Sequence, residues 1–143
     1  HSGVLGANGV VGVVRKVSPN FSVVMSILHR QTRISARIRN RNFFGSLVWK
    51  GTDTRLFNLE DIPKHALLSK GDTVETSGYS AIFPPGIMIG RIEDFGIEPG
   101  SNFYTLTVRS EQDMSNIQHV YVVKNILRKE QEDIEQAVLQ EDQ

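Results

Sequence analysis

Three residues with the chemistry of a serine hydrolase, His29, Asp61 and Ser77, follow one another in the order used by two-barrel hydrolases. A serine nucleophile also needs a sharp turn and an oxyanion hole. Ser77 lies in "ETSGYS", which has no flanking pattern for either, and His29 lies in "LHRQT" between strand-like segments. We therefore predict a non-catalytic protein and keep a two-barrel serine hydrolase as the weaker alternative.

The sequence offers no pattern for a metal or a cofactor. The histidines stand singly, without the paired spacing of metal ligands, and there is no cysteine to supply a thiolate. The glycine-rich start "GVLGANG" lacks the G-x-G-x-x-G order and the strand-before, helix-after context of a phosphate cradle. It is more typical of a turn that leads into a strand. We expect no metal site and no cofactor.

A row of five arginines between Arg30 and Arg41 is the strongest candidate for contact with an anionic partner. Laid along one face of a strand and followed by Phe43 and Phe44, the row could contact nucleic acid. The chain is not basic overall and carries no RNP, KH or helix-turn-helix signature, so we expect no nucleic-acid partner and keep that function as an alternative. An edge strand protected by charge explains the same row.

Charge is divided between the two halves of a chain whose net charge is zero. Residues 1–70 carry 11 Lys and Arg against 3 Asp and Glu, whereas residues 71–143 carry 5 against 13. Complementary potentials of this kind steer partners toward each other or favour pairing between copies of one chain. Two separately solvated faces are the plainer interpretation.

The elements that position these residues are β-strands almost throughout. Alternating, valine-rich segments recur every eight to twelve residues between turn formers, which predicts about nine strands in a sandwich or barrel. Residues 10–17 and 22–28 are expected to form a hairpin, and residues 87–94 and 102–108 another. Ile34, Ala36 and Ile38 are expected on one face of a half-buried strand.

We predict an all-β fold with two small barrel lobes and a short helical or disordered C-terminal tail. The first lobe, residues 1–72, is expected to be incomplete at its N-terminus, and the second comprises residues 73–123, with a last strand that can return to the first lobe. Residues 124–143 form the acidic tail, where Ile134 and Val138 give only a thin apolar stripe.

The segment "TSGYSAIFPPGIMIGRI", residues 76–92, places rigid and apolar residues in one loop. Prolines fix φ and so reduce the entropy lost on docking, which makes the loop a candidate protein-binding surface. Its candidate contacts are Tyr79, Ile82, Phe83, Pro84 and Pro85, with Arg33, Arg37 and Arg39 as a second surface. The alternative is that Ile82 and Phe83 close one end of a barrel.

Several segments resemble MreC, the bacterial rod shape-determining family. "GVVGVVRKVSPNFSVV" resembles the entry strands of that family, and "KGDTVETSGYSAIFPPGIMIGRI" is similar to its most recognisable motif. "GSLVWKG" and "VRSEQDMSNIQHVYVV" resemble its middle and closing segments. The resemblance covers about residues 9–123. It departs from the family pattern at "LHRQT", and at the start, where a further family strand is expected.

The resemblance implies a scaffold of the cell-elongation machinery on the periplasmic side of the inner membrane. It implies coupling of the MreB cytoskeleton, through MreD and RodZ, to peptidoglycan synthases, with a class B penicillin-binding protein as the direct partner of the β region. It also implies self-association, no catalysis, and membrane attachment only through an N-terminal helix that is absent from this sequence.

Overall fold

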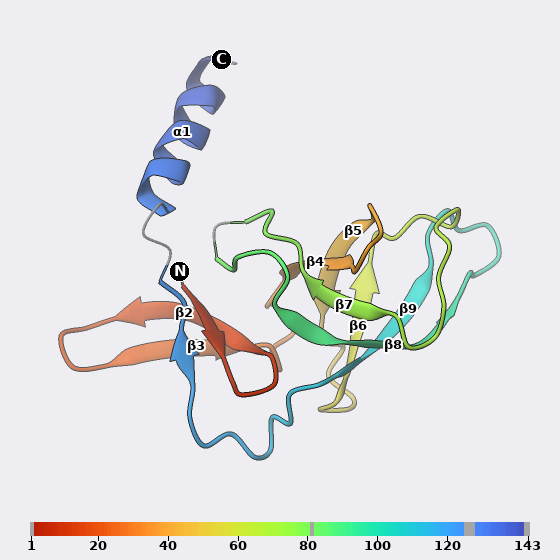
Figure 1. The fold of residues 1–143 in the computed structure, drawn as a ribbon, viewed down its shortest axis with the longest axis horizontal. Helices are drawn as coiled ribbons and strands as arrows, with labels where there is room; N and C mark the ends of the chain where they lie inside the picture. The colour runs from red at the N-terminus through yellow and green to blue at the C-terminus, as the bar shows by residue number, and fades with distance from the viewer. Residues whose placement is uncertain (1, 81, 125–127, 142–143) are drawn as a thin grey trace.

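The computed structural model describes residues 2–80, 82–124 and 128–141, which form a four-stranded sheet, a six-stranded barrel and a C-terminal helix (Figure 1). The sheet has the order β10-β1-β2-β3 and contains β1 (Gly3–Leu5), β2 (Val10–Val17), β3 (Ser22–Ser26) and β10 (Tyr121–Val122). The barrel has the order β4-β5-β6-β9-β8-β7. Its strands are β4 (Ile34–Ile38), β5 (Phe44–Val48), β6 (Leu56–Glu60), β7 (Thr73–Thr76), β8 (Met88–Gly96) and β9 (Thr105–Ser110).

The sheet is built around the predicted hairpin of β2 and β3. The two strands pair antiparallel, with Val14 opposite Val24, and a register shift between Val14 and Lys16 bends β2. The segment of β1, predicted as a turn that leads into a strand, is itself a short strand that pairs with both β2 and β10. The strand has only three residues and lies in a glycine-rich segment, so the sequence shows no alternation of apolar and polar residues there.

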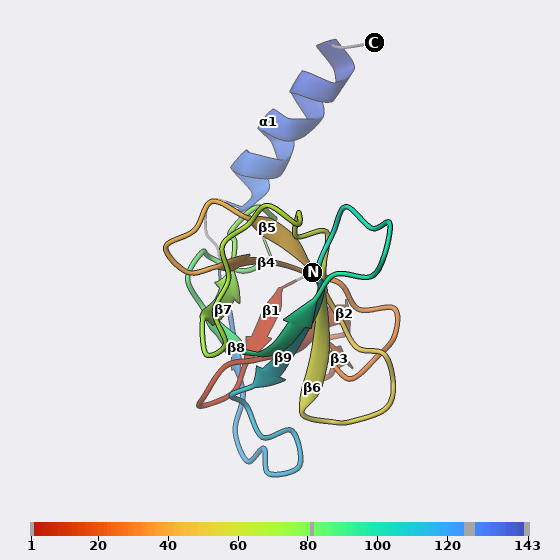
Figure 2. The same cartoon turned by 90° about the vertical axis from the view of Figure 1, so that its right-hand side faces the viewer.

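The barrel closes because β4 pairs with β5 on one side and with β7 on the other (Figure 2). The expected alternation along β4 is confirmed, since Ile34, Ala36 and Ile38 are buried. The interior is filled by large apolar side chains, among which Phe57 and Leu106 are almost fully buried. A closed barrel leaves no free strand edge, so β4 is not the edge strand that the arginine row suggested.

One apolar core joins the sheet to the barrel. Val10 and Val13 of β2 belong to the same cluster of buried residues as the barrel interior. On β1 and β2 a smaller cluster of Val4, Val11 and Val14 is packed by Met114 and Ile117, which lie beyond β9. The chain thus returns from the barrel to the sheet through a segment that packs on it.

The strand pairing divides the chain differently from the predicted boundary at residue 72. β4, β5 and β6 precede that boundary, yet they pair with β7 and β9 in one barrel. The first unit in the described residues is the open four-stranded sheet, and the last strand, β10, pairs with β1 within it. This division is set by pairing between strands that are distant in the sequence, and no local sequence pattern reveals such pairing.

The acidic segment predicted to be helical or disordered contains α1 (Arg128–Glu141), which projects from the end of β10 (Figure 1). Ile134, Val138 and Leu139 on it are exposed. Within the described residues no helix has the length and apolar character needed to cross a membrane.

The tightest backbone approach in the barrel gives a test of the fold. A Cβ atom at Gly90 of β8 would collide with the backbone oxygen of Arg109 on β9. We expect Gly90→Ala to lower the free energy of unfolding by about 1–3 kcal/mol, because the backbone must shift to accept the methyl group. Urea unfolding measures the change.

Gly96 on the same strand is the matched control, because a Cβ atom there meets nothing within 4 Å. Gly96→Ala is expected to be neutral or slightly stabilising, since alanine reduces the entropy of the unfolded chain. Equal destabilisation by both substitutions would contradict the described packing of β8 on β9.

Candidate protein-binding site

The loop between β7 and β8, here called the tip loop (residues 77–80 and 82–87), is held closed by Thr76. The Thr76 hydroxyl donates to the carbonyl oxygen of Pro84 at 2.7 Å and accepts from the amide of Ile87 at 2.9 Å. Its backbone N–H donates to the carbonyl of Ile87, and its carbonyl accepts from the amide of Gly86. Four hydrogen bonds on one buried threonine therefore fix both ends of the loop.

The first turn of the tip loop is also ordered by short-range contacts. The Ser77 hydroxyl lies 2.7 Å from that of Ser35 on β4 and accepts from the amide of Tyr79. Gly78 has a φ of 73°, and a Cβ atom there would approach the ring of Pro85 to 2.8 Å. Glycine is thus required at this position both by the backbone and by the proline that packs on it.

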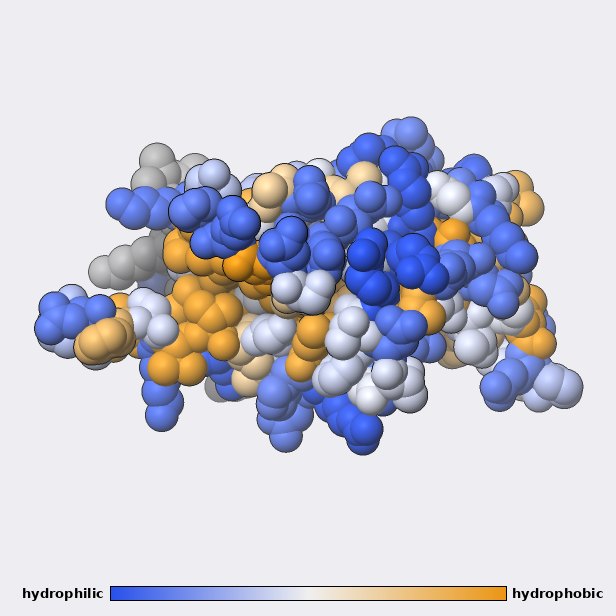
Figure 3. Space-filling view, turned by 90° about the horizontal axis from the view of Figure 1, so that it is seen from below, coloured by the Kyte–Doolittle hydropathy of each residue, from blue (hydrophilic) through white to orange (hydrophobic). Residues whose placement is uncertain are grey.

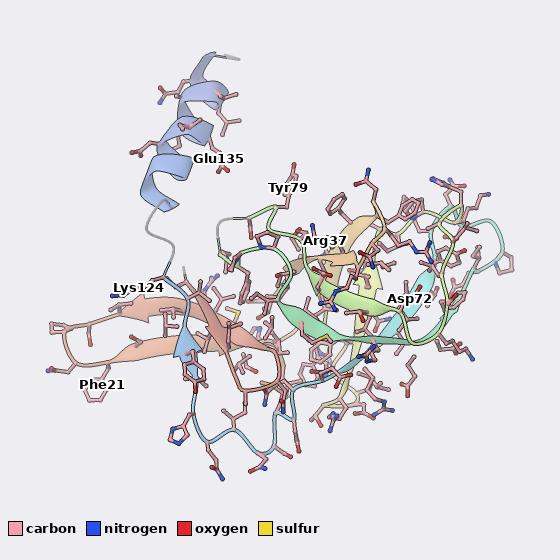
Figure 4. All side chains as sticks on the ribbon, in the orientation of Figure 1. Phe21, Arg37, Asp72, Tyr79, Lys124 and Glu135 are labelled. Atoms are coloured by element: carbon pink, nitrogen blue, oxygen red, sulfur yellow. The ribbon has the colours of Figure 1, made fainter. Side chains whose placement is uncertain are left out.

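The tip loop presents only part of its apolar residues to solvent. Tyr79 is 82% exposed and points away from the barrel (Figure 4), and Pro84 and Pro85 of the same loop are also exposed. Ile82 is half-buried and packs against the core. Phe83 is only 4% exposed, so a partner cannot contact its side chain.

Phe83 instead joins the barrel side of the core to β1. A Cβ atom at Gly3 would overlap the Phe83 ring, and the amide of Gly3 donates to the carbonyl of Ile82 at 3.2 Å. The position of Phe83 therefore agrees with the alternative prediction, in which this side chain serves packing. Sequence periodicity does not show which way a loop aromatic points, because a loop has no regular alternation.

Three arginines of the row, Arg33, Arg37 and Arg39, pair with carboxylates of neighbouring strands. Arg37 Nη2 lies 3.1 Å from Glu75 Oε2, and Arg39 Nε lies 2.6 Å from Glu75 Oε1. Arg33 pairs with Glu60 at 3.3 Å, and Glu60 also lies 3.6 Å from Lys50. The stripe that the nucleic-acid alternative requires is thus only partly neutralised, because two carboxylates face three arginines of the row and Lys50. Arg33, Arg37 and Arg39 are not brought to the tip of the loop.

Glu75 is the buried member of this cluster and is 3% exposed. Burial raises the pKa of its carboxyl group, but hydrogen bonds from Arg39 and Arg37, together with their charges, outweigh burial and hold the pKa below its ordinary value. Glu75 Oε2 also lies 3.2 Å from where a Cβ atom of Gly86 would stand. The ion pairs therefore support the base of the tip loop directly.

The roles of Glu75 and Thr76 are not evident from the sequence. Each arginine lies 36 or 38 positions from Glu75, so no local spacing reveals the ion pairs. The one signal available was a charged residue within the short apolar strand "TVETS". Strand alternation alone predicts that such a residue faces solvent, because alternation takes no account of the loop that covers β7.

The three residues of the hydrolase alternative have separate structural contacts. His29 Nδ1 accepts from the amide of Gln31, and Ser77 bonds to Ser35. Asp61 is exposed and has a φ of 73°. No hydrogen bond joins His29, Asp61 and Ser77 across the described residues, and the same residues contain no group of three His, Cys, Asp or Glu that could hold a metal ion.

The chain is similar in sequence to known shape-determining proteins. A family model described as rod shape-determining protein MreC, barrel core, matches residues 1–124. The cell shape-determining protein MreC of Listeria monocytogenes is 30% identical over 120 residues, which are 82% of this chain and 41% of that protein. The chain thus spans less than half the length of this curated relative.

Solved structures share the fold. The crystal structure of MreC from Pseudomonas aeruginosa superposes with a TM-score of 0.78 at 21% identity, covering 85% of this chain and 78% of that one. MreC from Helicobacter pylori, in a complex with the penicillin-binding protein PBP2, gives a TM-score of 0.69 at 20% identity and covers 87% and 78% of the two chains.

The Glu75 ion pairs predict an acid-dependent stability. We expect Glu75→Gln to lower the free energy of unfolding at neutral pH by about 1–3 kcal/mol, because Arg37 and Arg39 lose a charged acceptor. The folded-state pKa of Glu75 lies below its ordinary value of 4.5, so its contribution is present above that value and is lost as the pH falls through the folded pKa. The difference between parent and variant should therefore shrink below pH 4.5 in urea unfolding.

Glu93→Gln is the control for this series. Glu93 pairs with Arg109, but its side chain is exposed enough for water to weaken the interaction, so the variant should stay close to the parent. A Glu75→Gln variant as stable as the parent at neutral pH would contradict the assigned role of the buried carboxylate.

The Thr76 hydroxyl predicts the order of the tip loop. Thr76→Val keeps the side-chain shape but leaves the carbonyl of Pro84 and the amide of Ile87 without their bonds to the hydroxyl. We expect a loss of about 1–3 kcal/mol in unfolding free energy and faster hydrogen exchange at Ile87. Thr107→Val on β9 is the control, since its hydroxyl bonds to no described residue. Unchanged exchange at Ile87 would show that Thr76 does not fix the loop.

Proposed function

Because the chain belongs to the MreC family of rod shape-determining proteins, we propose that it is a non-catalytic scaffold that acts on the periplasmic side of the bacterial inner membrane. The family model covers residues 1–124, which include the sheet and the whole barrel. The function proposed for the chain is to hold enzymes of cell-wall elongation in place and so to maintain a rod shape.

The direct partner in this proposal is a class B penicillin-binding protein. The support is the fold shared with MreC of Helicobacter pylori, which is found in a complex with PBP2. A scaffold needs a surface whose geometry exists before the partner arrives, because ordering a mobile loop costs binding free energy. The closed barrel and its tip loop supply such a surface.

The observation that carries the proposal is the exposed apex of Tyr79, Pro84 and Pro85 on a loop fixed by hydrogen bonds. A tyrosine supplies a large contact area with few rotatable bonds and a hydroxyl for a polar partner. The two prolines lose little entropy on contact. The apex is therefore the part of the barrel best suited to an aromatic anchor.

The wider proposal links this contact to the cytoskeleton. Through MreD and RodZ, the chain would connect the MreB filament to the synthases, and copies of it would associate. The division of charge between the two halves of the chain supports self-association, because the basic half of one copy can attract the acidic half of another. Binding between copies should then weaken with added salt.

Substitution at the apex tests the proposed contact. We expect Tyr79→Ser to weaken binding to the periplasmic part of a class B penicillin-binding protein by about 2 kcal/mol, or roughly thirtyfold in Kd, because an exposed aromatic anchor is lost. Calorimetric titration measures Kd, and the fold should be unaffected because Tyr79 is exposed.

Leu67→Ser is the matched control, since Leu67 is a large apolar residue of similar exposure, 76%, outside the tip loop. It should leave Kd unchanged. If the parent chain does not bind any class B penicillin-binding protein of its own organism, the partner is wrong. If it binds and both variants bind equally well, the partner stands but the apex is not the contact.

A further inference from the structure

The turn between β2 and β3 carries two of the most exposed apolar side chains of the described residues. Val17 is 74% exposed and Phe21 is 79% exposed. The hairpin extends away from the barrel, and Phe21 lies at its far end (Figures 1 and 4). Seen from below, apolar surface gathers over the end of the molecule that holds the sheet, whereas the barrel end is mainly hydrophilic (Figure 3).

The turn is preformed. The amide of Ser18 donates to the carbonyl of Phe21 at 2.7 Å, and the amide of Phe21 donates back to the Ser18 hydroxyl at 3.1 Å. Pro19 lies between them and fixes its own φ. Phe21 is therefore held outward by a rigid turn, although a solvent-exposed phenylalanine gains nothing from this position in water.

Two cations lie directly behind this turn. Arg15 and Lys16 are exposed and form no ion pair with a described residue. Residues 1–52 contain eight Lys and Arg and no Asp or Glu, so the sequence around the hairpin offers no acid to neutralise them. On the barrel, by contrast, Arg37, Arg91 and Arg109 each pair with a carboxylate.

We propose that this hairpin end, called the hairpin tip (Val17 to Phe21 with Arg15 and Lys16), binds the surface of an anionic lipid bilayer. Val17 and Phe21 enter the boundary between headgroups and acyl chains, where apolar and aromatic side chains are stabilised. Arg15 and Lys16 contact the lipid phosphates, whose negative potential attracts unpaired cations near the surface. The contact orients the sheet toward the bilayer and leaves the tip loop free.

The shape of the hairpin tip favours a lipid surface over a protein. A stable protein interface buries about 800 Å² on each partner, whereas the projecting hairpin offers Val17 and Phe21 at its end and only Val23 and Val24 behind them on β3. A bilayer accepts a small convex wedge without a matching groove. The acidic helix α1 is the protein surface in this chain that offers complementary charge, and it is one outcome of the test.

Flotation with lipid vesicles tests the proposal on the full chain. The parent should float with vesicles that contain phosphatidylglycerol, and much less with pure phosphatidylcholine. Phe21→Ser should reduce the bound fraction about tenfold, since most of the inserted apolar surface is lost. The double variant Arg15→Gln and Lys16→Gln should reduce it at least tenfold and remove most of its dependence on salt.

Leu67→Ser is again the matched control, because it removes an equally exposed apolar residue from the barrel and should leave flotation unchanged. The chain has no cysteine, so Asn20→Cys can carry one environment-sensitive dye in the exposed turn. Its emission should shift to the blue with phosphatidylglycerol vesicles, and that of Leu67→Cys should not.

Two results would overturn the proposal. One is a parent chain that does not float with anionic vesicles. The candidate partner of the hairpin tip would then be a protein surface such as α1. The other is a Phe21→Ser variant that floats as the parent does. Neither result bears on the tip loop, because binding of a penicillin-binding protein is measured without lipid.

Discussion

The carboxylate of Glu75, buried between Arg37 and Arg39 where β4 meets β7, is the interaction on which the barrel and its exposed loop depend. A carboxylate at this depth is costly unless its charge is matched, and the two arginines match it while their own side chains stay partly in water. The pair joins the two strands that close the barrel. It also lies under Gly86, so that the same ion pairs support both the junction of β4 with β7 and the base of the loop.

The barrel and the sheet, at the two ends of the molecule, therefore differ in how their charged side chains are paired. On the barrel five arginines pair with the carboxylates of Glu75, Glu60, Glu93 and Glu111, and the tip loop presents an exposed tyrosine and two prolines. The sheet has unpaired cations beside exposed apolar residues at its hairpin. In the proposed scaffold these two chemically different faces lie on parts of the chain that share one apolar core.

Most of the strands could be predicted from the sequence because each is a local pattern. The alternation of Ile34, Ala36 and Ile38 and the hairpin of residues 10–17 and 22–28 both depend on patterns of a few residues, and both are confirmed. The orientation of Phe83 could not be predicted, because its burial depends on Gly3, some eighty positions away. The same holds for the ion pairs of Arg33, Arg37 and Arg39 and for the division between the two units, which depend on pairing between distant strands.

The central claim is that the barrel, with its tip loop supported by Glu75 and Thr76, presents that loop to a cell-wall synthase. Hydrogen exchange of the chain, alone and bound to the periplasmic part of a class B penicillin-binding protein, tests it most directly. Binding should slow exchange in the peptide that contains Tyr79 and Gly86 beyond the protection that Thr76 already provides, and leave the β2–β3 hairpin unchanged. Protection confined to the hairpin or to β6 and β9, with none in the tip loop, would contradict the account.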